Sequence, residues 1–461
     1  MKKVVEDFRE SSDAFRSHIA GLSEGAISVT LEKLGRLSDD SLREVLIELS
    51  QHKNSNIRKA AVKNLAKFSD VTLADSLFKI AKSDESTEVR RESVSAIGRM
   101  RDKSNKKLLM ELLDDQDPKV VLQAMRGLIA IKKEVSLKAV LAKCENHPNE
   151  QVQELLRTAL LDGKSSRKSD AKDDLHYKSN PKLQNLVVQG DTIEIMKLIP
   201  SESVHLTFTS PPYYNARDYS IYRSYSEYLD FLKEVFQNVN RITKEGRFLI
   251  VNSSPIIVPR ISRSHASKRF PIPFDLHTIL TQLGWEFIDD IIWLKPEASA
   301  KNRNAGFLQH RKPLAYKPNA ITEMLMVYRK KTDKLIDWNI DQYPDDIVET
   351  SKVKDGYETS NVWRVDPTFD RTHSAVFPRA LCERVIDYYS MRGDLVFDPF
   401  AGSGTIGKVA LEQKRLFLLT EIDKSYFVRI KENLDSPSLF DSSPVRFISL
   451  EQFKENIANG N

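Results

Sequence analysis

Residues 1–163 carry apolar side chains at helical spacing in four similar segments. The segments begin at Asn56, Glu88, Lys119 and Gln151, so the pattern repeats after about thirty residues. The second residue of each segment is an apolar anchor, and another apolar residue follows it eight positions later. This spacing puts both on one helix face. The anchor pairs are Ile57 and Leu65, Val89 and Ile97, Val120 and Leu128, and Val152 and Leu160. A polar turn precedes each segment, so the pattern predicts stacked pairs of helices.

The combination of an Asp-rich turn, Val-Arg and small residues resembles HEAT or HEAT-like repeats over roughly Asp39 to Gly163. The last segment is atypical, because Arg157 stands at a position that is apolar in the other three. The resemblance implies an extended surface for a partner. A packing or dimerisation platform is an equal alternative to DNA or protein binding. The basic ridge residues are expected to form a solvated helix face: Arg58, Lys59, Arg90 and Arg91.

The pattern changes after Gly163. Residues 164–182 lose periodicity and are rich in Ser, Lys and Asp, which predicts a linker. Strands then alternate with helices from Leu183 onward, in "LQNLVVQGD", "VHLTFTS", "GRFLIVNS", "WEFIDDIIWLK", "TEMLMVYRK", "GDLVFDPF" and "KRLFLLTEID". The alternation predicts an α/β fold, a Rossmann-like doubly wound sheet, preceded by the all-α HEAT-like solenoid. The predicted domains are therefore 1–163 and 183–461.

Two consecutive prolines end one of the predicted strands, where "VHLTF" is followed by "TSPPYY". Proline fixes φ and lacks a backbone donor, so the strand has to stop there. Open α/β sheets bind their ligands at the carboxyl ends of strands, where a rigid kink is useful. A plain turn needs the same residues, so this motif alone leaves both interpretations open.

A second motif, "LVFDPFAGSGTIGKVAL", joins a strand to a helix through a glycine-rich turn. The strand ends at Asp398, the turn contains Gly402 and Gly404, and a helix follows from about Thr405. Glycines allow close backbone approach, and a helix N-terminus presents free N–H groups. The run matches G-x-G-x-x-G, although Asp-Pro-Phe-Ala separates the strand from the first glycine. Glu421 closes the next strand, where it is placed to accept hydrogen bonds from a ribose.

Together, "TSPPY" and "FDPFAGSG" resemble the amino-group DNA methyltransferases that use S-adenosylmethionine. The motif order is similar to the permuted beta class and the S-P-P-Y form to its cytosine-N4 type, over about Leu183 to Leu434. Asp191 in "GD" and Phe377 in "HSAVFP" lie in segments that resemble cofactor-contacting elements. Two positions depart from the family pattern: His205 replaces the usual Asp, and Ser374 replaces the usual Pro.

The resemblance implies transfer of a methyl group from S-adenosylmethionine to the N4 amine of a cytosine flipped out of duplex DNA. This amine is a poor nucleophile, so catalysis needs acceptors for both of its N–H bonds. Ser210 Oγ is one expected acceptor and a carbonyl of Pro211 or Pro212 the other, while Tyr213 offers a stacking face. The residues expected to bind the cofactor are Asp191, Phe377, Asp398, Pro399, Phe400, Gly402, Ser403, Gly404, Thr405 and Glu421.

Two other functions stay open. An N6-adenine methyltransferase is the nearest alternative, because both bases present an amine to the same acceptors. A non-enzymatic solenoid scaffold with a decayed methyltransferase domain is an alternative of another class, and the complete motifs argue against it. A cytosine-C5 enzyme is excluded, because neither Cys144 nor Cys382 lies in a Pro-Cys context.

Residues 246–274 and 298–322 contain no acidic side chain and accumulate basic ones. Basic loops beside a catalytic cleft suit phosphate contacts, although a loop can also be basic by chance. Target recognition is expected within residues 295–372. The predicted DNA-binding residues are Arg260, Arg263, Lys268, Arg269, Lys301, Arg303, Arg311 and Lys312.

The composition adds limits to this picture. The 461 residues are 40% hydrophobic and 29% charged, as in a soluble globular protein, and the net charge of +5 is too small to prove a polyanionic partner. The two cysteines are far apart and have no CxxC or Cys/His partner, so a reducing compartment and no metal site are expected. No apolar run suits a membrane or a signal peptide, so we expect a cytoplasmic protein without a membrane partner. The expected partners are double-stranded DNA, a companion restriction endonuclease in a restriction-modification system, and a protein that binds the solenoid.

Overall fold

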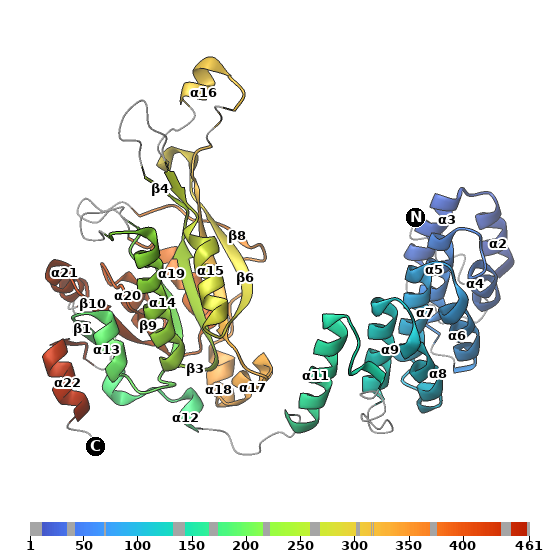
Figure 1. Ribbon diagram of the computed structural model, residues 1–461, viewed down its shortest axis with the longest axis horizontal. Helices are drawn as coiled ribbons and strands as arrows, with labels where there is room; N and C mark the ends of the chain where they lie inside the picture. The colour runs from blue at the N-terminus through green and yellow to red at the C-terminus, as the bar shows by residue number, and fades with distance from the viewer. Residues whose placement is uncertain are drawn as a thin grey trace. The chain divides into compact units, whose positions relative to one another are not determined.

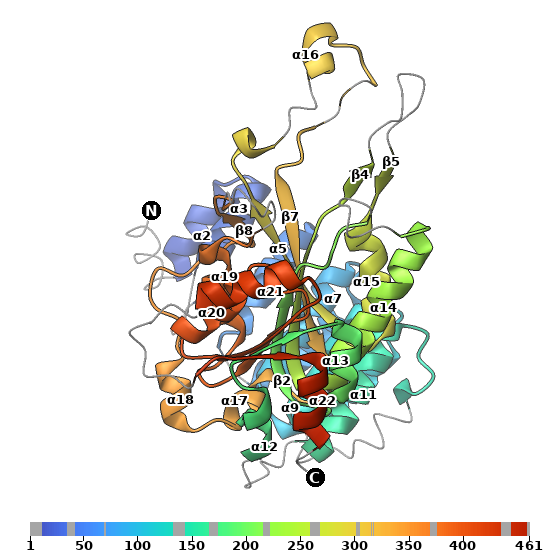
Figure 2. The same cartoon turned by 90° about the vertical axis from the view of Figure 1, so that its left-hand side faces the viewer.

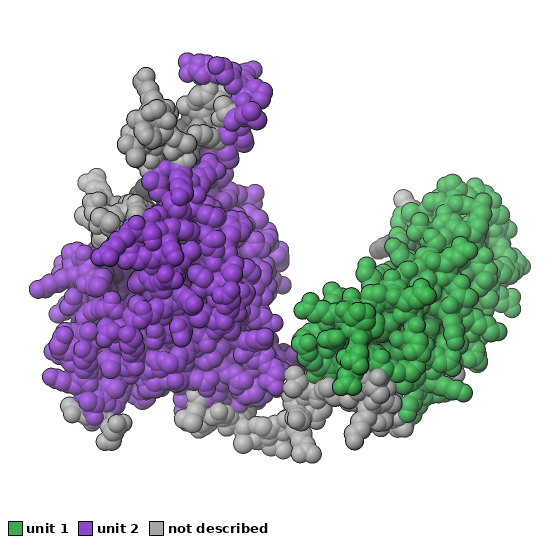
Figure 3. Space-filling model, viewed as in Figure 1, with its two compact units in different colours: residues 1–168 green, residues 169–461 purple. Residues whose placement is uncertain are grey.

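The computed structural model separates the chain into two units, Met1–Lys168 and Ser169–Asn461 (Figure 3). It describes residues 12–34, 42–68, 71–131, 143–165, 174–214, 222–258, 268–300, 305–314, 316, 318–368, 376–434 and 444–458. Among the helices of these ranges, none combines the length and the hydrophobicity that crossing a bilayer requires. Each unit has its own hydrophobic core.

The described part of the first unit consists of helices, as predicted (Figure 1, blue to teal). They are α2 (Ser12–Ala20), α3 (Glu24–Lys33), α4 (Arg43–Leu49), α5 (Ser55–Leu65), α6 (Ala74–Ser83), α7 (Thr87–Arg99), α8 (Lys106–Glu111), α9 (Pro118–Ala130) and α11 (Glu150–Ser165). The four predicted repeat segments are α5, α7, α9 and α11. Their first anchors, Ile57, Val89, Val120 and Val152, are fully buried. The all-α part of the fold prediction is therefore confirmed.

The basic ridge of the repeats is not the solvated face that the sequence suggested. Arg58 forms a two-pronged contact with Asp84, with both N–O distances at 2.8 Å. Arg90 contacts Asp115 in the same way at 3.1 and 3.3 Å. Each arginine thereby joins one repeat helix to the turn that enters the next. These two guanidinium groups are engaged within the solenoid, because planar arginine and carboxylate groups match in geometry.

The second unit is built on a nine-stranded sheet with the order β11-β1-β10-β9-β2-β3-β7-β6-β8. The strands are β1 (Leu186–Gln189), β2 (Val204–Thr209), β3 (Thr243–Ser253), β6 (Trp285–Leu294), β7 (Thr322–Lys330), β8 (Val362–Arg364), β9 (Leu395–Asp398), β10 (Leu416–Glu421) and β11 (Arg446–Ser449). Of these strands, only β7 runs antiparallel to its neighbours. The seven predicted strands are all present. The sequence missed β8 and β11, which have three and four residues.

Helices cover both faces of this sheet (Figure 2). One face packs against α13 (Thr192–Leu198), α14 (Tyr225–Ile242), α15 (Ile272–Gln282) and α22 (Leu450–Ala458). The other packs against α19 (Arg379–Tyr389), α20 (Thr405–Glu412) and α21 (Lys424–Leu434). The central strands are buried on both sides, which explains why β2 and β9 are almost uniformly apolar or uncharged. The doubly wound α/β prediction is confirmed.

The sheet has a topological switch point between β9 and β2. These strands are parallel neighbours, with Leu206 opposite Val396. The chain leaves β9 through α20 toward β10 on one side, and leaves β2 through α14 toward β3 on the other. The two loops at the carboxyl ends therefore diverge and leave a crevice, where open sheets bind their ligands.

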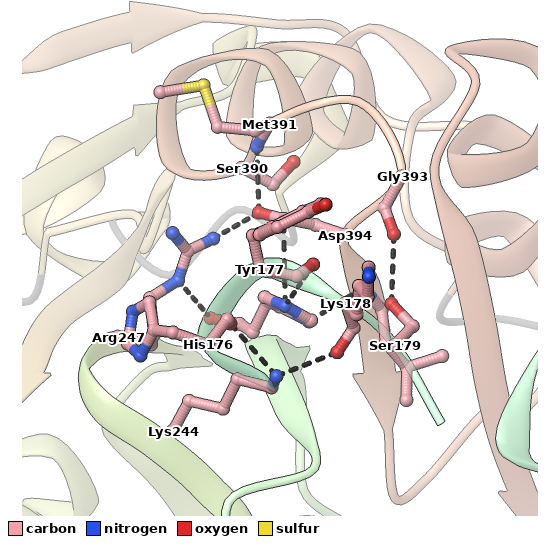
Figure 4. Close-up of polar contacts among 12 residues, drawn as sticks. His176, Tyr177, Lys178, Ser179, Lys244, Arg247, Ser390, Met391, Gly393 and Asp394 are labelled. Atoms are coloured by element: carbon pink, nitrogen blue, oxygen red, sulfur yellow. Dashed lines mark hydrogen bonds and ion pairs between the residues drawn. The ribbon is translucent and has the colours of Figure 1, made fainter. Parts of the chain in front are cut away.

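Part of the predicted linker is folded onto the second unit, so the linker prediction is wrong for residues 174–182. We call this segment the strap; it includes α12 (Asp174–Tyr177) and begins the short helix η5 (Pro181–Leu183). Lys244 Nζ donates to the carbonyls of His176 and Lys178 at 2.9 and 2.8 Å (Figure 4). Lys182 Nζ also donates to the carbonyl of Asn456, in α22, at 3.3 Å. Residues 166–173 lie outside the described ranges.

His205, one of the two departures from the family pattern, holds the strap to the sheet. Its Nδ1 accepts a hydrogen bond from Leu395 N at 3.1 Å, so its Nε2 carries the proton and donates to Tyr177 O at 3.2 Å. Complete burial lowers the pKa of His205 to about 3, so the ring is neutral. The other departure, Ser374, lies outside the described residues.

Candidate active site

The Ser-Pro-Pro-Tyr motif lies where β2 ends, at the switch point. β2 stops at Thr209, and Ser210 to Tyr213 continue as an irregular loop. All four motif residues line a cavity of about 540 Å³. Pro211 is buried, while the other three are half-buried at the cavity wall. The prolines thus keep this loop rigid and keep its carbonyls clear of competing backbone donors.

The glycine-rich motif forms the opposite wall of the same cavity. Gly402 and Gly404 adopt left-handed φ angles of 52° and 77°, which a side chain would strain. Gly404 is the N-cap of α20, and a Cβ there would lie 2.9 Å from Ile430 Cγ2. The third glycine of the run, Gly407, packs against β10, since its Cβ would meet Leu419 Cδ1 at 2.7 Å. The three glycines therefore serve the turn, the helix start and helix–sheet packing respectively.

A buried hydrogen bond joins the two motifs. Thr209 Oγ1 donates to Asp398 Oδ1 at 2.7 Å, and the same oxygen accepts from Phe400 N at 3.0 Å. Burial raises the pKa of Asp398 to about 7 from its usual 3.8, against the lowering effect of these two donors. The carboxyl group thus locks the end of β2 to the start of the glycine loop.

We predict that Asp398 makes the stability of the protein depend on pH. The folded protein holds the Asp398 proton more tightly than the unfolded chain does. The free energy of unfolding should therefore fall as pH rises from about 4 to about 7, by up to roughly 4 kcal/mol. In Asp398→Asn the side chain stays neutral and keeps an acceptor oxygen. The free energy of unfolding of this variant should therefore fall less over the same pH range. Urea denaturation of both proteins at pH 5 and pH 7.5 measures this, and equal declines would contradict the prediction.

Glu421 fixes the glycine loop from the end of β10. Its Oε2 accepts from Gly402 N at 2.8 Å and its Oε1 from Asp423 N at 2.9 Å. Burial raises the pKa of this carboxyl group. A carboxylate has about four lone-pair sites, so acceptor capacity remains for a ligand in the cavity. Glu421 thus shapes the loop as well as lining the site.

Nearly all of the predicted cofactor residues line this cavity. Of the ten, Gly404 alone is absent from the wall, and the others come together from four segments of the sequence. Phe377 lies beside Phe208 with ring centroids 4.7 Å apart, and Asp191 caps α13 by accepting from Glu194 N at 3.0 Å. The sequence did not single out several further wall residues: Thr192, Tyr222, Phe231, Ile422, Asp423 and Tyr426. Asp423 could have been found, because it lies two residues after Glu421.

We predict that Gly402→Val and Glu421→Ala both weaken cofactor binding. Valine at a left-handed φ distorts the turn, and alanine removes the acceptor for Gly402 N. The expected loss is about tenfold or more in affinity, as removal of a charged hydrogen bond suggests. Gly393→Ala is a matched control, since Gly393 also has a positive φ, of 84°, with nothing within 4 Å of its Cβ position. Calorimetry showing unchanged S-adenosylmethionine affinity in both variants would remove this loop as the cofactor site.

The structure describes four of the eight predicted DNA-binding residues. Lys268 and Arg269 are exposed on β5 (Lys268–Phe270), which pairs with β4 (Ile256–Val258). Arg311 and Lys312 are exposed just after α16 (Ala305–His310). Both segments project from the same end of the second unit (Figure 2). Arg260, Arg263, Lys301 and Arg303 lie outside the described residues.

The range predicted for target recognition contains segments of different kinds. The described parts of residues 296–321 lie between β6 and β7 in the chain and include α16, which projects beyond the unit (Figure 1). β7 is a central strand of the sheet. The helices α17 (Ile336–Asp341) and α18 (Asp345–Thr350) lie near α12 in both views, away from α16. We therefore narrow the recognition proposal to residues 296–321.

Comparison with known proteins identifies the family. A family model described as DNA methylase matches residues 204–432, which contain both motifs, and a HEAT-repeat model matches residues 74–161. Type II methyltransferase M.ScaI of Streptomyces caespitosus is 30% identical over 251 residues, an alignment that covers 52% of this chain and 78% of that protein. The chain belongs to the DNA methylase family.

Two further relatives extend the comparison. The DNA methylase is 27% identical to Type II methyltransferase M.Cfr9I of Citrobacter freundii over 271 residues, covering 52% of this chain and 83% of that one. It is 26% identical to DNA adenine methyltransferase YhdJ of Escherichia coli strain K12 over 271 residues, covering 56% and 84%. The chain is thus a DNA amino-methyltransferase whose cofactor is S-adenosylmethionine. One of these three relatives is named for adenine and none for cytosine. Family membership therefore does not determine which base this chain methylates.

Proposed function

We propose that this DNA methylase transfers a methyl group to the N4 amine of cytosine at a specific site in duplex DNA. The supporting observation is Ser210, a neutral acceptor at the wall of the cavity that the glycine loop also lines. The cavity volume of about 540 Å³ is in the range of cofactor sites. Its apolar wall at Phe377 and its carboxylate at Glu421 suit the aromatic and hydroxyl groups of a nucleoside.

The proposed mechanism places the target amine between two acceptors. Ser210 Oγ accepts one N–H, and a carbonyl of Pro211 or Pro212 accepts the other. Holding both hydrogens directs the nitrogen lone pair toward the methyl donor, which S-adenosylmethionine supplies when bound. Tyr213 presents a ring at the cavity wall for the flipped base. The residues proposed to hold the cofactor are those predicted from the sequence, with Gly404 shaping the loop.

DNA is proposed to bind between the two projecting segments. The β4–β5 pair carries Lys268 and Arg269, and the segment after α16 carries Arg311 and Lys312. Exposed basic side chains of this kind contact phosphates and fix the register of the duplex. Sequence reading is proposed to lie in residues 296–321, where Asn and Gln accompany the basic residues.

The same site supports N6-adenine methylation as the second candidate, which the likeness to YhdJ favours. Sequencing DNA from cells that express the protein, with detection of modified bases, decides between the two. N4-methylcytosine at one recurring sequence would support the proposal, and N6-methyladenine would replace it. The relatives named Type II methyltransferases add the proposal of a companion restriction endonuclease.

The solenoid is proposed to bind a protein rather than DNA. Arg58 and Arg90 occupy the same position in successive repeats, and they are paired with Asp84 and Asp115 inside the solenoid. Lys59 also contacts Glu88, at 2.5 Å. A phosphate backbone attracts unpaired basic side chains, which this ridge offers in smaller number than its sequence suggested.

A further inference from the structure

A carboxylate from another strand contacts the tyrosine of the catalytic motif. Glu323 lies on β7, and its Oε2 accepts from Tyr213 Oη at 3.3 Å and from Asn252 Nδ2 at 2.5 Å. Its Oε1 accepts from Lys295 Nζ. Asn252 lies at the end of β3 and Lys295 directly follows β6. Glu323 therefore receives donors from three elements that meet beside the motif.

The hydroxyl group of Tyr213 donates to Glu323 and lies beside two serine side chains. The bond to Glu323 measures 3.3 Å, and the side chains of Ser254 and Ser210 are within reach of the same oxygen as donors. A phenolic oxygen has one hydrogen and two lone pairs. The Glu323 carboxylate is paired with Lys295 and accepts, so the Tyr213 hydrogen points to Glu323. The two lone pairs of Tyr213 then remain for the hydroxyl hydrogens of Ser254 and Ser210.

This assignment determines what Ser210 can offer to a substrate. A serine hydroxyl has one hydrogen and two lone pairs, and by itself it can either donate or accept. With its hydrogen directed to Tyr213, Ser210 Oγ presents only lone pairs to the cavity. An aspartate at this position would be an acceptor without help, whereas a serine needs its hydrogen bound elsewhere.

We propose that Glu323 is a positioning residue that makes Ser210 an acceptor, through the ordered hydrogen bonds from Ser210 to Tyr213 to Glu323. Lys295 and Asn252 hold the carboxylate in place from the other side. The inference rests on the proposed acceptor role of Ser210 but not on which base is methylated. Glu323 contacts Lys295 at the end of the β6–β7 pair that leads into the described parts of residues 296–321. The same contacts thus connect the recognition segment to the catalytic motif.

The test compares Glu323→Gln, Tyr213→Phe and the double variant with the wild type, on whichever base the wild type is found to methylate. Glutamine has one acceptor oxygen and two donor hydrogens, so it no longer fixes the direction of the Tyr213 hydrogen. Each single variant should lose about tenfold to 100-fold in the single-turnover rate, the loss expected for one hydrogen bond to a charged group. The double variant should lose no more than the more affected single variant, because both changes interrupt one chain.

Controls separate positioning from general damage. Glu245→Gln removes another lysine-paired carboxylate, one on β3 that accepts from Lys334 Nζ at 2.6 Å, and should leave the rate unchanged. Affinity for S-adenosylmethionine and the thermal midpoint should stay at wild-type values in the Glu323 and Tyr213 variants. Glu323→Asp keeps the charge and should recover part of the rate.

Several results would overturn the proposal. They are a wild-type rate in Glu323→Gln, losses that multiply in the double variant, or a loss confined to DNA affinity. If Glu323→Gln fails to fold, Tyr213→Phe decides alone, and a wild-type rate in that variant rejects the chain. Detection of the modified base in the wild type tests the proposed function separately, since the rate comparison holds for cytosine or adenine.

Discussion

Ser210→Ala is expected to lower the single-turnover rate of methyl transfer by roughly 100-fold or more, as loss of one oriented hydrogen-bonding group does in other active sites. The change removes the acceptor for one N–H of the target amine. It leaves the glycine loop untouched, because no described hydrogen bond of Gly402 or Glu421 involves Ser210. Affinity for S-adenosylmethionine should therefore stay within about twofold of the wild type.

Quenched-flow measurement with saturating enzyme isolates the chemical step from binding and product release. Ser254→Ala is the matched control, since Ser254 also contacts Tyr213 but does not line the cavity. A wild-type rate in Ser210→Ala would exclude Ser210 as an acceptor. A loss of cofactor affinity instead would move its role from the base to the cofactor.

Removal of the strap is expected to unfold the second unit. A fragment that starts at Leu183 lacks the Tyr177 carbonyl bound by His205 and two carbonyls bound by Lys244. It also lacks His176 Nε2, which lies 3.0 Å from Asn339 Nδ2. Lost partners of buried polar groups cost roughly 1–3 kcal/mol each, and more for a charged one. The sum is comparable to the roughly 5–15 kcal/mol that stabilise a typical domain.

A fragment that starts at Ser169 is the control, because it keeps the strap and the whole second unit. Circular dichroism and urea denaturation should show a cooperative transition for this fragment and none for the shorter one. Equal stability of the two fragments would show that the strap is dispensable. The longer fragment should methylate the same site as the full chain, with unchanged DNA affinity at two salt concentrations if the solenoid binds a protein.

The site at the strand ends could be predicted from the sequence, because the proline and glycine residues that restrict the backbone there form recognisable motifs. "SPPY" and "GSG" each end a strand, and parallel strands bring their ends to one edge. Glu323 left no such pattern. It approaches Tyr213 across 110 residues, and an acidic residue that starts a strand is ordinary in a sequence.

The strap escaped prediction for a different reason. It binds Lys244 and His205 through backbone carbonyls, which every residue possesses. A polar, aperiodic segment can therefore be either a free linker or a docked one.

The solenoid arginines show a related ambiguity. In the sequence, a basic helix face looks the same whether its side chains are solvated or paired with carboxylates. The carboxylates that pair with Arg58 and Arg90 lie 26 and 25 residues further along the chain.

The contact between Lys182 and α22 brings the end of the strap next to the last described helix of the second unit. A peptide that joins the start of the strap to the end of α22 could close this unit into a ring without disturbing a strand. Opening the ring at another surface loop would give a chain that starts at a different element and builds the same sheet. Protein engineers could exploit this to attach a reporter or a second binding module on the side of their choice. The catalytic and cofactor motifs would then follow each other in the opposite order along the polypeptide while remaining neighbours in space.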